Sequence, residues 1–179
     1  MKIQVDDLTF EPMLSHEKIQ ERIAELGYQI NQDYQNQIPL FIGVLSGSFM
    51  FLADLIKTVN TPTEVTFVKL ASYQGKSSSG QMDLQLGLTV PINNRTVIVV
   101  EDIVDTGHTL TYLLDMLQKE KPKSISICSL LLKPEACRYQ FEELKYVGFE
   151  IPNNFVVGYG LDYNGLGRNL KDIYRLATN

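Results

Sequence analysis

Residues 97–110, VIVVEDIVDTGHTL, begin with four β-branched residues, continue through a pair of carboxylates and end in a small polar turn. Continuous β-branched residues predict a fully buried strand over 96–100, with Glu101 and Asp102 directly after its end. Four leucines recur at helical spacing after the turn and predict a helix over 109–117. The stretch therefore predicts a strand-turn-helix unit whose strand ends in negative charge.

The turn at residues 105–109, DTGHT, has the composition of an anion-binding helix start. Two hydroxyls, a glycine and the free N–H groups of a first helical turn are the donors that a phosphate needs. Glu101 and Asp102 would instead attract ribose hydroxyls or Mg²⁺, so a sugar phosphate satisfies both halves of the stretch. Two simpler interpretations stay open: a solvated loop for the acidic pair, and Asp105 as the helix N-cap. A receiver-type phosphoacceptor site would leave the DTGHT turn unexplained.

Similar units recur along the chain. Apolar spacing predicts a helix over 15–34, with Ser15 as its cap, and another over 49–59. Further strands are predicted at residues 40–45, 64–71, 124–132, 146–151 and 155–159. Alternating strands and helices predict an α/β fold with a mostly parallel sheet, in a single domain over 1–179. Neither GxGxxG nor GxxxxGK[ST] occurs, which argues against dinucleotide-binding folds and P-loop NTPases.

Composition narrows the class of partner. The chain has 179 residues, 44% of them hydrophobic and 21% charged, with a formal net charge of −5 at pH 7. This balance favours neither nucleic acid nor a membrane as a partner, and the uncharged stretch 38–53 contains Pro39 and two glycines, unlike a membrane span. The first residues lack the apolar core of a signal peptide. Cys128 and Cys137 have no metal-ligand spacing, so we expect reduced thiols and a cytoplasmic location.

The motif VEDIVDTGHTL at 100–110 resembles the phosphoribosyl pyrophosphate (PRPP) motif of type I phosphoribosyltransferases, in the form carried by the hypoxanthine-guanine branch. Other segments match that branch in order: LSGSFMFLADLI at 45–56, SYQG at 72–75, SLLLKPEA at 129–136 and FVVGYGLDYNGLGRNL at 155–170. The similarity covers nearly the whole chain. It implies the type I phosphoribosyltransferase fold, with a mostly parallel central sheet flanked by helices, a small hood region and a flexible loop.

The resemblance implies a Mg²⁺-dependent enzyme of purine salvage. It would transfer the 5-phosphoribosyl group from PRPP to hypoxanthine or guanine, giving IMP or GMP and pyrophosphate, and would form a homodimer or homotetramer. Two alternatives stay open: a PRPP-sensing regulator that has lost turnover, and a phosphoribosyltransferase for another base such as xanthine or a pyrimidine. A regulator of nucleic acid would carry a dense basic run, which the scattered lysines and arginines do not form.

By resemblance, each matching residue acquires an expected role on the PRPP side. Glu101 and Asp102 would hold the ribose hydroxyls, directly or through Mg²⁺, and Asp105 would be the catalytic acid or base near purine N7. The 5′-phosphate would lie on Asp105, Thr106, Gly107, His108 and Thr109. Pyrophosphate would contact Ser46, Gly47 and Arg168.

On the purine side, the resemblance implies contacts with Lys133, Phe155, Val156 and Asp162. Lys133 would donate to O6, Phe155 would stack on the ring, and Val156 would pair with the base through its backbone. Asp162 would face the 2-position side of the purine or a second metal, apart from the metal at Glu101 and Asp102.

Two segments of the PRPP side need separate mention. Ser46 is the clearest departure from the family, which usually carries lysine or arginine there, so backbone N–H groups would act instead of a side-chain charge. The peptide bond between Leu45 and Ser46 is predicted to be cis, as in relatives. Ser72 and Tyr73 begin a polar loop over 72–81 that is predicted to close over PRPP and exclude water.

Overall fold

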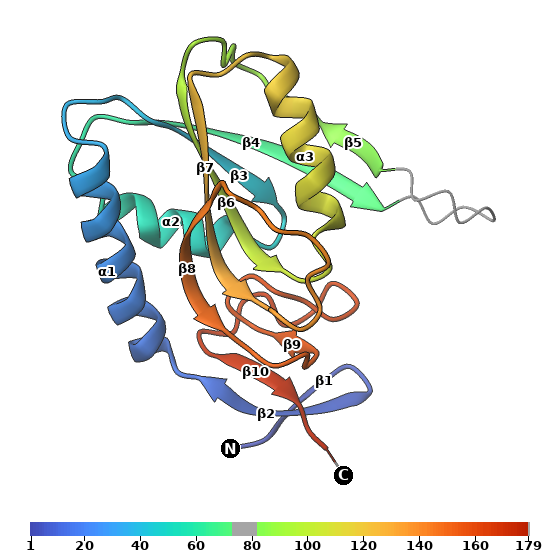
Figure 1. Cartoon of the computed structure of the whole chain (residues 1–179). Coiled ribbons are helices and arrows are strands. Elements are labelled where there is room, and N and C mark those ends of the chain that lie inside the picture. Colours follow the sequence, from blue (N-terminus) through green and yellow to red (C-terminus); the bar gives the residue numbers. More distant parts are fainter. Residues whose placement is uncertain (73–81, 179) are drawn as a thin grey trace.

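The computed structural model describes residues 1–72 and 82–178, and the centre of this part of the chain is a six-stranded sheet (Figure 1). The strand order is β5 (Met82–Leu86), β4 (Glu64–Ser72), β3 (Leu40–Leu45), β6 (Thr96–Val104), β7 (Ser124–Leu132) and β8 (Leu144–Glu150). All neighbours pair in parallel except β5, which runs antiparallel to β4 at one edge. The mostly parallel α/β sheet is confirmed, whereas β5 was not predicted.

In the described residues, three helices cover both faces of this sheet. α1 (His16–Asp33) and α2 (Phe49–Lys57) pack on one face and α3 (His108–Lys119) on the other, each with its own cluster of buried residues. The Ser15 hydroxyl accepts from the Lys18 N–H at 3.4 Å, which confirms the predicted cap of α1. No helix in this part of the chain has both the length and the apolar character of a membrane span.

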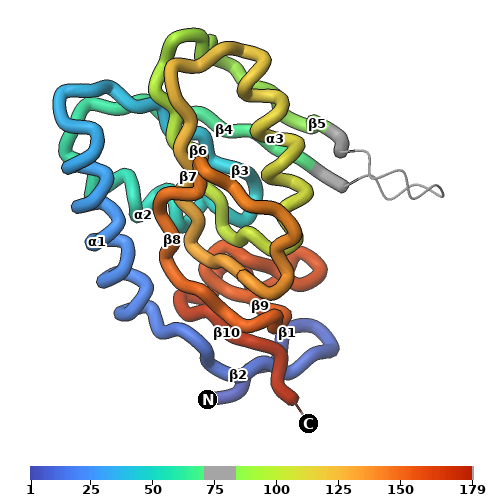
Figure 2. The backbone as a smooth tube through the Cα atoms, viewed as in Figure 1, coloured from blue at the N-terminus to red at the C-terminus, as the bar shows by residue number. Residues whose placement is uncertain are grey.

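A smaller antiparallel sheet, here called the hood sheet, lies beyond the carboxyl ends of β6, β7 and β8 (Figures 1 and 2). Its strand order is β1 (Ile3–Val5), β2 (Leu8–Leu14), β10 (Ile173–Leu176) and β9 (Val156–Val157). Strands β1, β2 and β10 were not predicted. The strand predicted over 155–159 shrinks to two residues and belongs to this sheet, because the backbone takes positive φ from Gly158 to Gly160.

Strand β6 is longer than the sequence predicted. We expected it to end at Val100, but it continues to Val104, and Glu101 pairs in register with Ser129 of β7. The neighbouring parallel strand supplies hydrogen-bond partners beyond the apolar run, which a local pattern does not reveal. Glu101 is buried, so the solvated-loop interpretation of the acidic pair is wrong.

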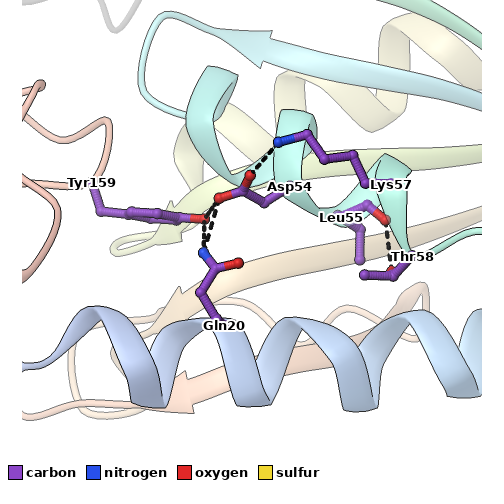
Figure 3. Close-up of polar contacts among 6 residues, drawn as sticks. All are labelled: Gln20, Asp54, Leu55, Lys57, Thr58 and Tyr159. Atoms are coloured by element: carbon purple, nitrogen blue, oxygen red, sulfur yellow. Dashed lines mark hydrogen bonds and ion pairs between the residues drawn. The ribbon is translucent and has the colours of Figure 1, made fainter.

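The contact between α1 and α2 depends on a glycine in the middle of α1. A Cβ atom on Gly27 would lie 1.8 Å from the Thr58 hydroxyl oxygen and 2.6 Å from the Thr58 Cβ atom. The Thr58 hydroxyl is fixed because it donates to the Leu55 carbonyl at 2.7 Å, at the C-terminal end of α2 (Figure 3). Any side chain at position 27 would therefore force the two helices apart.

We expect Gly27→Ala to lower the free energy of unfolding by about 1–3 kcal/mol, the usual range for overpacking. Alanine favours helix by about 1 kcal/mol relative to glycine, which offsets only part of this loss. Denaturant unfolding measures the change. A suitable control is Gly87→Ala, where the nearest atom to the added Cβ is a leucine methyl at 3.5 Å. Equal or greater stability of Gly27→Ala would contradict the packing argument.

Candidate active site

A cavity of about 250 Å³ lies at the carboxyl end of β6, where the chain turns into α3. This is the edge at which open α/β sheets bind ligands. The lining residues are Glu101, Asp102, Ile103, Val104, Asp105, Thr106, Gly107, Thr109 and Leu110. The residues predicted for ribose and 5′-phosphate thus share one cavity, with the exception of His108.

The helix start in this cavity is built on Gly107. Its φ is +86°, and an added Cβ would lie 2.9 Å from the Tyr139 ring and 3.1 Å from the Phe141 ring, so both backbone and packing require glycine. Gly107 is also the N-cap of α3 and has no side-chain oxygen to accept from the first-turn N–H groups. These groups therefore face the cavity as donors for an anion. The interpretation of Asp105 as the N-cap is wrong.

Glu101, which is buried, and Asp102, which is partly buried, form an acidic pair. Burial raises the pKa of Glu101 well above its ordinary value, and the neighbouring Asp102 carboxylate raises it further. Burial also raises the pKa of Asp102, although an N–H donated by Ile103 at 2.9 Å and the positive charge of Arg168 counteract this. Among the described residues, the Glu101 Oε2 atom is buried without a hydrogen-bond partner. The pair therefore lacks a donor or cation that a ligand would supply.

The loop after β3 packs directly against this pair. The peptide bond between Leu45 and Ser46 is cis, as predicted. A Cβ atom on Gly47 would lie 1.4 Å from Asp102 Oδ2, and a Cβ atom on Gly160 would lie 2.1 Å from the Gly47 carbonyl oxygen. The chain can bring the three segments this close only because positions 47 and 160 are glycines.

Arg168 joins the same region from the hood side. It donates through Nη1 to the Gly160 carbonyl at 2.6 Å and pairs through Nη2 with Asp162 Oδ1 at 2.6 Å. The three residues predicted for pyrophosphate, Ser46, Gly47 and Arg168, thus converge beside Asp102. Asp162 Oδ2 accepts from the Gly165 N–H at 2.7 Å, so both of its oxygens are engaged.

Lys133 and Asp105 come together across the end of the sheet. The Lys133 Nζ atom lies 2.6 Å from Asp105 Oδ2, and the lysine is only 6% exposed whereas the aspartate side chain is 44% exposed. The Lys133 N–H donates to the Val104 carbonyl at 2.9 Å, which fixes the end of β7 against β6. Sequence reasoning named both residues but did not predict that they form an ion pair.

Phe155 and Val156 lie at the free edge of the hood sheet. Phe155 is 43% exposed, with its ring edge-on to Tyr163 at a centroid distance of 5.7 Å. Val156 stands opposite Arg175, and the Leu176 N–H bonds to the Phe155 carbonyl at 2.8 Å. Alternation along an antiparallel ladder then directs the N–H and C=O groups of Val156 away from β10. An open ring face and two open backbone groups are thus side by side.

The remaining predicted site residues lie outside the cavity or outside the described residues. His108 is exposed and its Nδ1 atom bonds to the Tyr139 hydroxyl at 3.0 Å, a contact that no local sequence pattern indicated. Ser72 ends β4, and the rest of the predicted flexible loop, with Tyr73, lies outside the described residues. Within 1–72 and 82–178 no group of three acidic, histidine or cysteine side chains is close enough to hold a metal ion. Asp162 therefore does not cluster with Glu101 and Asp102.

Comparison with known proteins agrees with this geometry. The family model described as the phosphoribosyl transferase domain matches residues 11–164. The chain belongs to the phosphoribosyltransferase family. Among curated relatives, the hypoxanthine-guanine phosphoribosyltransferase of Bacillus subtilis is 42% identical over 159 residues, which are 88% of each protein. The bifunctional protein TilS/HprT of Listeria monocytogenes is 43% identical over 159 residues, but the chain spans only 24% of its length.

Solved structures support the same assignment. A crystal structure of a hypoxanthine-guanine phosphoribosyltransferase from Bacillus anthracis superposes with a TM-score of 0.88 at 39% identity, covering 93% of this chain and 98% of that one. A hypoxanthine phosphoribosyltransferase from Staphylococcus aureus gives a TM-score of 0.87 at 42% identity, covering 93% of this chain and 91% of that one. The type I phosphoribosyltransferase fold predicted from the resemblance is therefore confirmed.

The acidic pair has a consequence for stability. The folded state favours protonated Glu101. The stability that this carboxyl group contributes is therefore fully present below the ordinary carboxyl pKa and is lost as pH rises through the raised pKa. Glu101→Gln keeps the shape and removes the charge. Without metal, we expect this variant to have a higher Tm than the wild type near pH 8, with the difference shrinking towards about pH 4.

Thermal unfolding in the presence of a chelator measures this difference. Glu142→Gln, which neutralises an exposed carboxylate, should show no such pH-dependent gain. If Glu101→Gln is no more stable than the wild type near pH 8, the charge at Glu101 is not destabilising.

Proposed function

We propose that the chain catalyses Mg²⁺-dependent transfer of the 5-phosphoribosyl group from PRPP to hypoxanthine or guanine, giving IMP or GMP and pyrophosphate. The observation that carries the choice of base is the ion pair between Lys133 and Asp105 beside the anion cavity. In a 6-oxopurine, O6 and N7 lie on the same edge of the ring. The ammonium can donate a hydrogen bond to O6, and the neighbouring carboxylate can accept one from N7 when N7 carries a proton.

The PRPP half of the reaction is assigned to the cavity at the end of β6. Thr106, Thr109 and the first-turn N–H groups of α3 would hold the 5′-phosphate. Glu101 and Asp102 would accept from the ribose hydroxyls, and their negative charge would stabilise positive charge that develops at the ribose as the bond to pyrophosphate breaks. Ser46, Gly47 and Arg168 would contact the leaving pyrophosphate.

The acidic pair fits a divalent cation. Glu101 Oε2 is buried without a partner among the described residues, and Asp102 lies beside it. Mg²⁺ usually binds proteins through one or two carboxylates and completes its shell with water and substrate phosphates, so two residues are sufficient. Bound there, the ion would neutralise charge on the leaving pyrophosphate. Asp162, whose oxygens are engaged by Arg168 and Gly165, is a weaker candidate ligand.

The purine would lie between the two sheets. Phe155 offers an exposed face for stacking, and Val156 offers open backbone groups to the far edge of the base. Lys133 would donate to O6. Asp105 would accept a hydrogen bond from the protonated N7. As purine N9 bonds to the ribose, the base loses this proton and Asp105 would take it up.

The wider setting is also a proposal. We place the protein in the cytoplasm in a purine salvage role, in keeping with two free cysteines. We infer a single domain over residues 1–179, because the hood sheet pairs β2 near the start with β10 near the end. The exposed apolar residues Val65, Phe67 and Leu86 on β4 and β5 offer a surface for the expected homodimer or homotetramer.

A spectrophotometric assay with PRPP, Mg²⁺ and a panel of bases tests the function. We expect turnover of hypoxanthine or guanine, loss of turnover in a chelator, and no use of adenine. Binding of PRPP without turnover of any base would favour the PRPP-sensing regulator. Turnover only of xanthine or a pyrimidine would favour a phosphoribosyltransferase for another base.

Asp105→Asn should lower kcat by about 100-fold or more, the scale of a lost acid or base group, and leave PRPP binding largely intact. The variant also leaves the Lys133 ammonium without its counterion, so thermal unfolding must show that it is folded. Pre-steady-state turnover separates chemistry from binding. A fall in PRPP affinity with unchanged single-turnover chemistry would assign Asp105 to binding alone.

Lys133→Gln should lower activity on 6-oxopurines and narrow the discrimination against adenine. A fixed ammonium faces an acceptor at C6 of hypoxanthine but an amino donor in adenine, and a buried mismatch of this kind costs several kcal/mol. A glutamine amide can present either a donor or an acceptor. The ratio of kcat/KM for hypoxanthine and adenine measures the change, with the exposed Lys145→Gln as control. An unchanged ratio would show that Lys133 does not select the base.

A further inference from the structure

A partly buried hydrogen-bond network connects the hood segment to both helices on one face of the sheet (Figure 3). The Tyr159 hydroxyl donates to Asp54 Oδ2 of α2 at 2.5 Å, and Gln20 of α1 donates to the same oxygen at 2.9 Å. Lys57 pairs with the other oxygen of Asp54 at 2.8 Å. Tyr159 is completely buried, and burial together with the Asp54 carboxylate raises the pKa of its hydroxyl. The phenol therefore stays a donor.

Tyr159 is held in a backbone conformation that it would not adopt alone. Its φ is +50°, in the left-handed region that a bulky residue occupies only when its surroundings compensate. The flanking residues Gly158 and Gly160 each have a φ of +100°. Three consecutive residues of positive φ form a sharp turn, and the side chain of Tyr159 is the anchor that ties this turn to α1 and α2.

The turn at Tyr159 is in direct contact with the PRPP side of the active site. The Cα atom of Gly160 packs on the Gly47 carbonyl, and Gly47 packs on the Asp102 carboxylate. The Gly160 carbonyl also accepts from Arg168, and the Gly160 N–H donates to the Arg168 carbonyl at 3.0 Å. A shift of this turn would therefore move both Gly47 and Arg168.

We propose that Tyr159, anchored by Asp54 and Gln20, is a positioning residue for pyrophosphate recognition. It does not touch the substrate. Its hydroxyl fixes the turn whose backbone sets the distance between Gly47 and Arg168, the two groups assigned to the leaving pyrophosphate. This inference rests on the proposed function for the identity of the anion.

The positioning role should affect binding of PRPP and pyrophosphate but not binding of the base. Lys133 and Asp105 lie at the ends of β7 and β6, and the Tyr159 hydroxyl bonds to neither of them. Phe155 and Val156 precede Tyr159 in the same segment but are held by their own pairing with β10, so the contacts with the base do not depend directly on the network. Loss of the hydroxyl should weaken PRPP and pyrophosphate but not hypoxanthine. A purely structural role would instead lower stability without separating the two substrates.

The chain offers a matched control for this test. The Tyr146 hydroxyl donates to Asp33 Oδ2 at 2.5 Å, so it also joins a buried tyrosine to an aspartate on a helix. It connects β8 to the C-terminal end of α1 and takes no part in the contacts of Gly47, Gly160 or Arg168. Tyr146→Phe thus removes the same type of bond at a place remote from the proposed anion site.

The test compares Tyr159→Phe and Tyr146→Phe by steady-state kinetics with PRPP and hypoxanthine, and by thermal unfolding. We expect both variants to lose stability. Only Tyr159→Phe should raise the KM for PRPP and the inhibition constant of inorganic pyrophosphate, by about tenfold for one lost hydrogen bond to a charged group. The KM for hypoxanthine should change by less than about twofold.

A double-mutant cycle identifies the anchor. Asp54→Asn keeps an acceptor for the Tyr159 hydroxyl and should retain most of the PRPP affinity, whereas Asp54→Ala should match Tyr159→Phe. Combining Asp54→Ala with Tyr159→Phe should add little further loss, because both changes remove the same bond. Full additivity would show that the two residues act separately and would overturn the proposal.

Calorimetric titration with Mg²⁺ and inorganic pyrophosphate separates this inference from the proposed function, because it needs no turnover. A wild type that binds pyrophosphate about tenfold more tightly than Tyr159→Phe supports the positioning role even if no base is turned over. The positioning role is overturned if Tyr159→Phe and Tyr146→Phe have the same PRPP and pyrophosphate affinities. It is also overturned if Tyr159→Phe weakens hypoxanthine and PRPP equally.

Discussion

The constraint on which the active site depends is the placement of two adjacent carboxylates, one buried and one partly buried, at the end of a parallel strand. Removing a carboxylate from water is costly unless it is hydrogen-bonded or paired, and Glu101 has one buried oxygen without a partner among the described residues. The surroundings supply partial compensation for Asp102 through the Ile103 N–H and the charge of Arg168. The protein's own residues therefore leave the acidic pair short of positive charge, which favours a cation or a polyhydroxylated substrate.

The same crowding explains why glycines occupy the contacts around the acidic pair. Gly47 touches the Asp102 carboxylate and Gly160 touches the Gly47 carbonyl, so two backbone segments and this carboxylate pack together with no other side chain between them. Backbone N–H groups can then face a ligand directly, which is the arrangement that anion sites use. Because Ser46 brings no charge to this loop, binding of an anion here would depend more on the backbone N–H groups and on Arg168.

Sequence reasoning predicted the elements whose signal is local. Continuous β-branched residues located β6, and the mainly apolar run 125–132 located β7. The spacing of Ile19, Ile23 and Leu26 located α1, since burial on one or both faces leaves a direct pattern. The hood strands left no comparable pattern. β9 has two residues, β2 contains Pro12, and β2 pairs with β10, more than 150 residues later in the chain. Their existence depends on tertiary contacts.

The site was predictable as a set of residues but not as a set of contacts. The resemblance named Lys133 and Asp105, yet only the fold places a buried ammonium beside a half-exposed carboxylate 28 residues earlier. The extension of β6 through Glu101 and Asp102 was likewise hidden, because polar residues in a strand are stabilised by pairing with a neighbour and not by their own propensity.

Both cationic side chains proposed to bind substrate are paired with carboxylates of the site. Arg168 pairs with Asp162, and each side chain is about 30% exposed, so this pair is worth only about 0–1 kcal/mol. In the proposed reaction, a multiply charged pyrophosphate would therefore take over the Arg168 guanidinium at little cost. Lys133 is more deeply buried and its exchange of Asp105 for a neutral purine oxygen would be unfavourable. The geometry instead favours a purine that contacts both groups at once, so that the ion pair persists while O6 and N7 are read together.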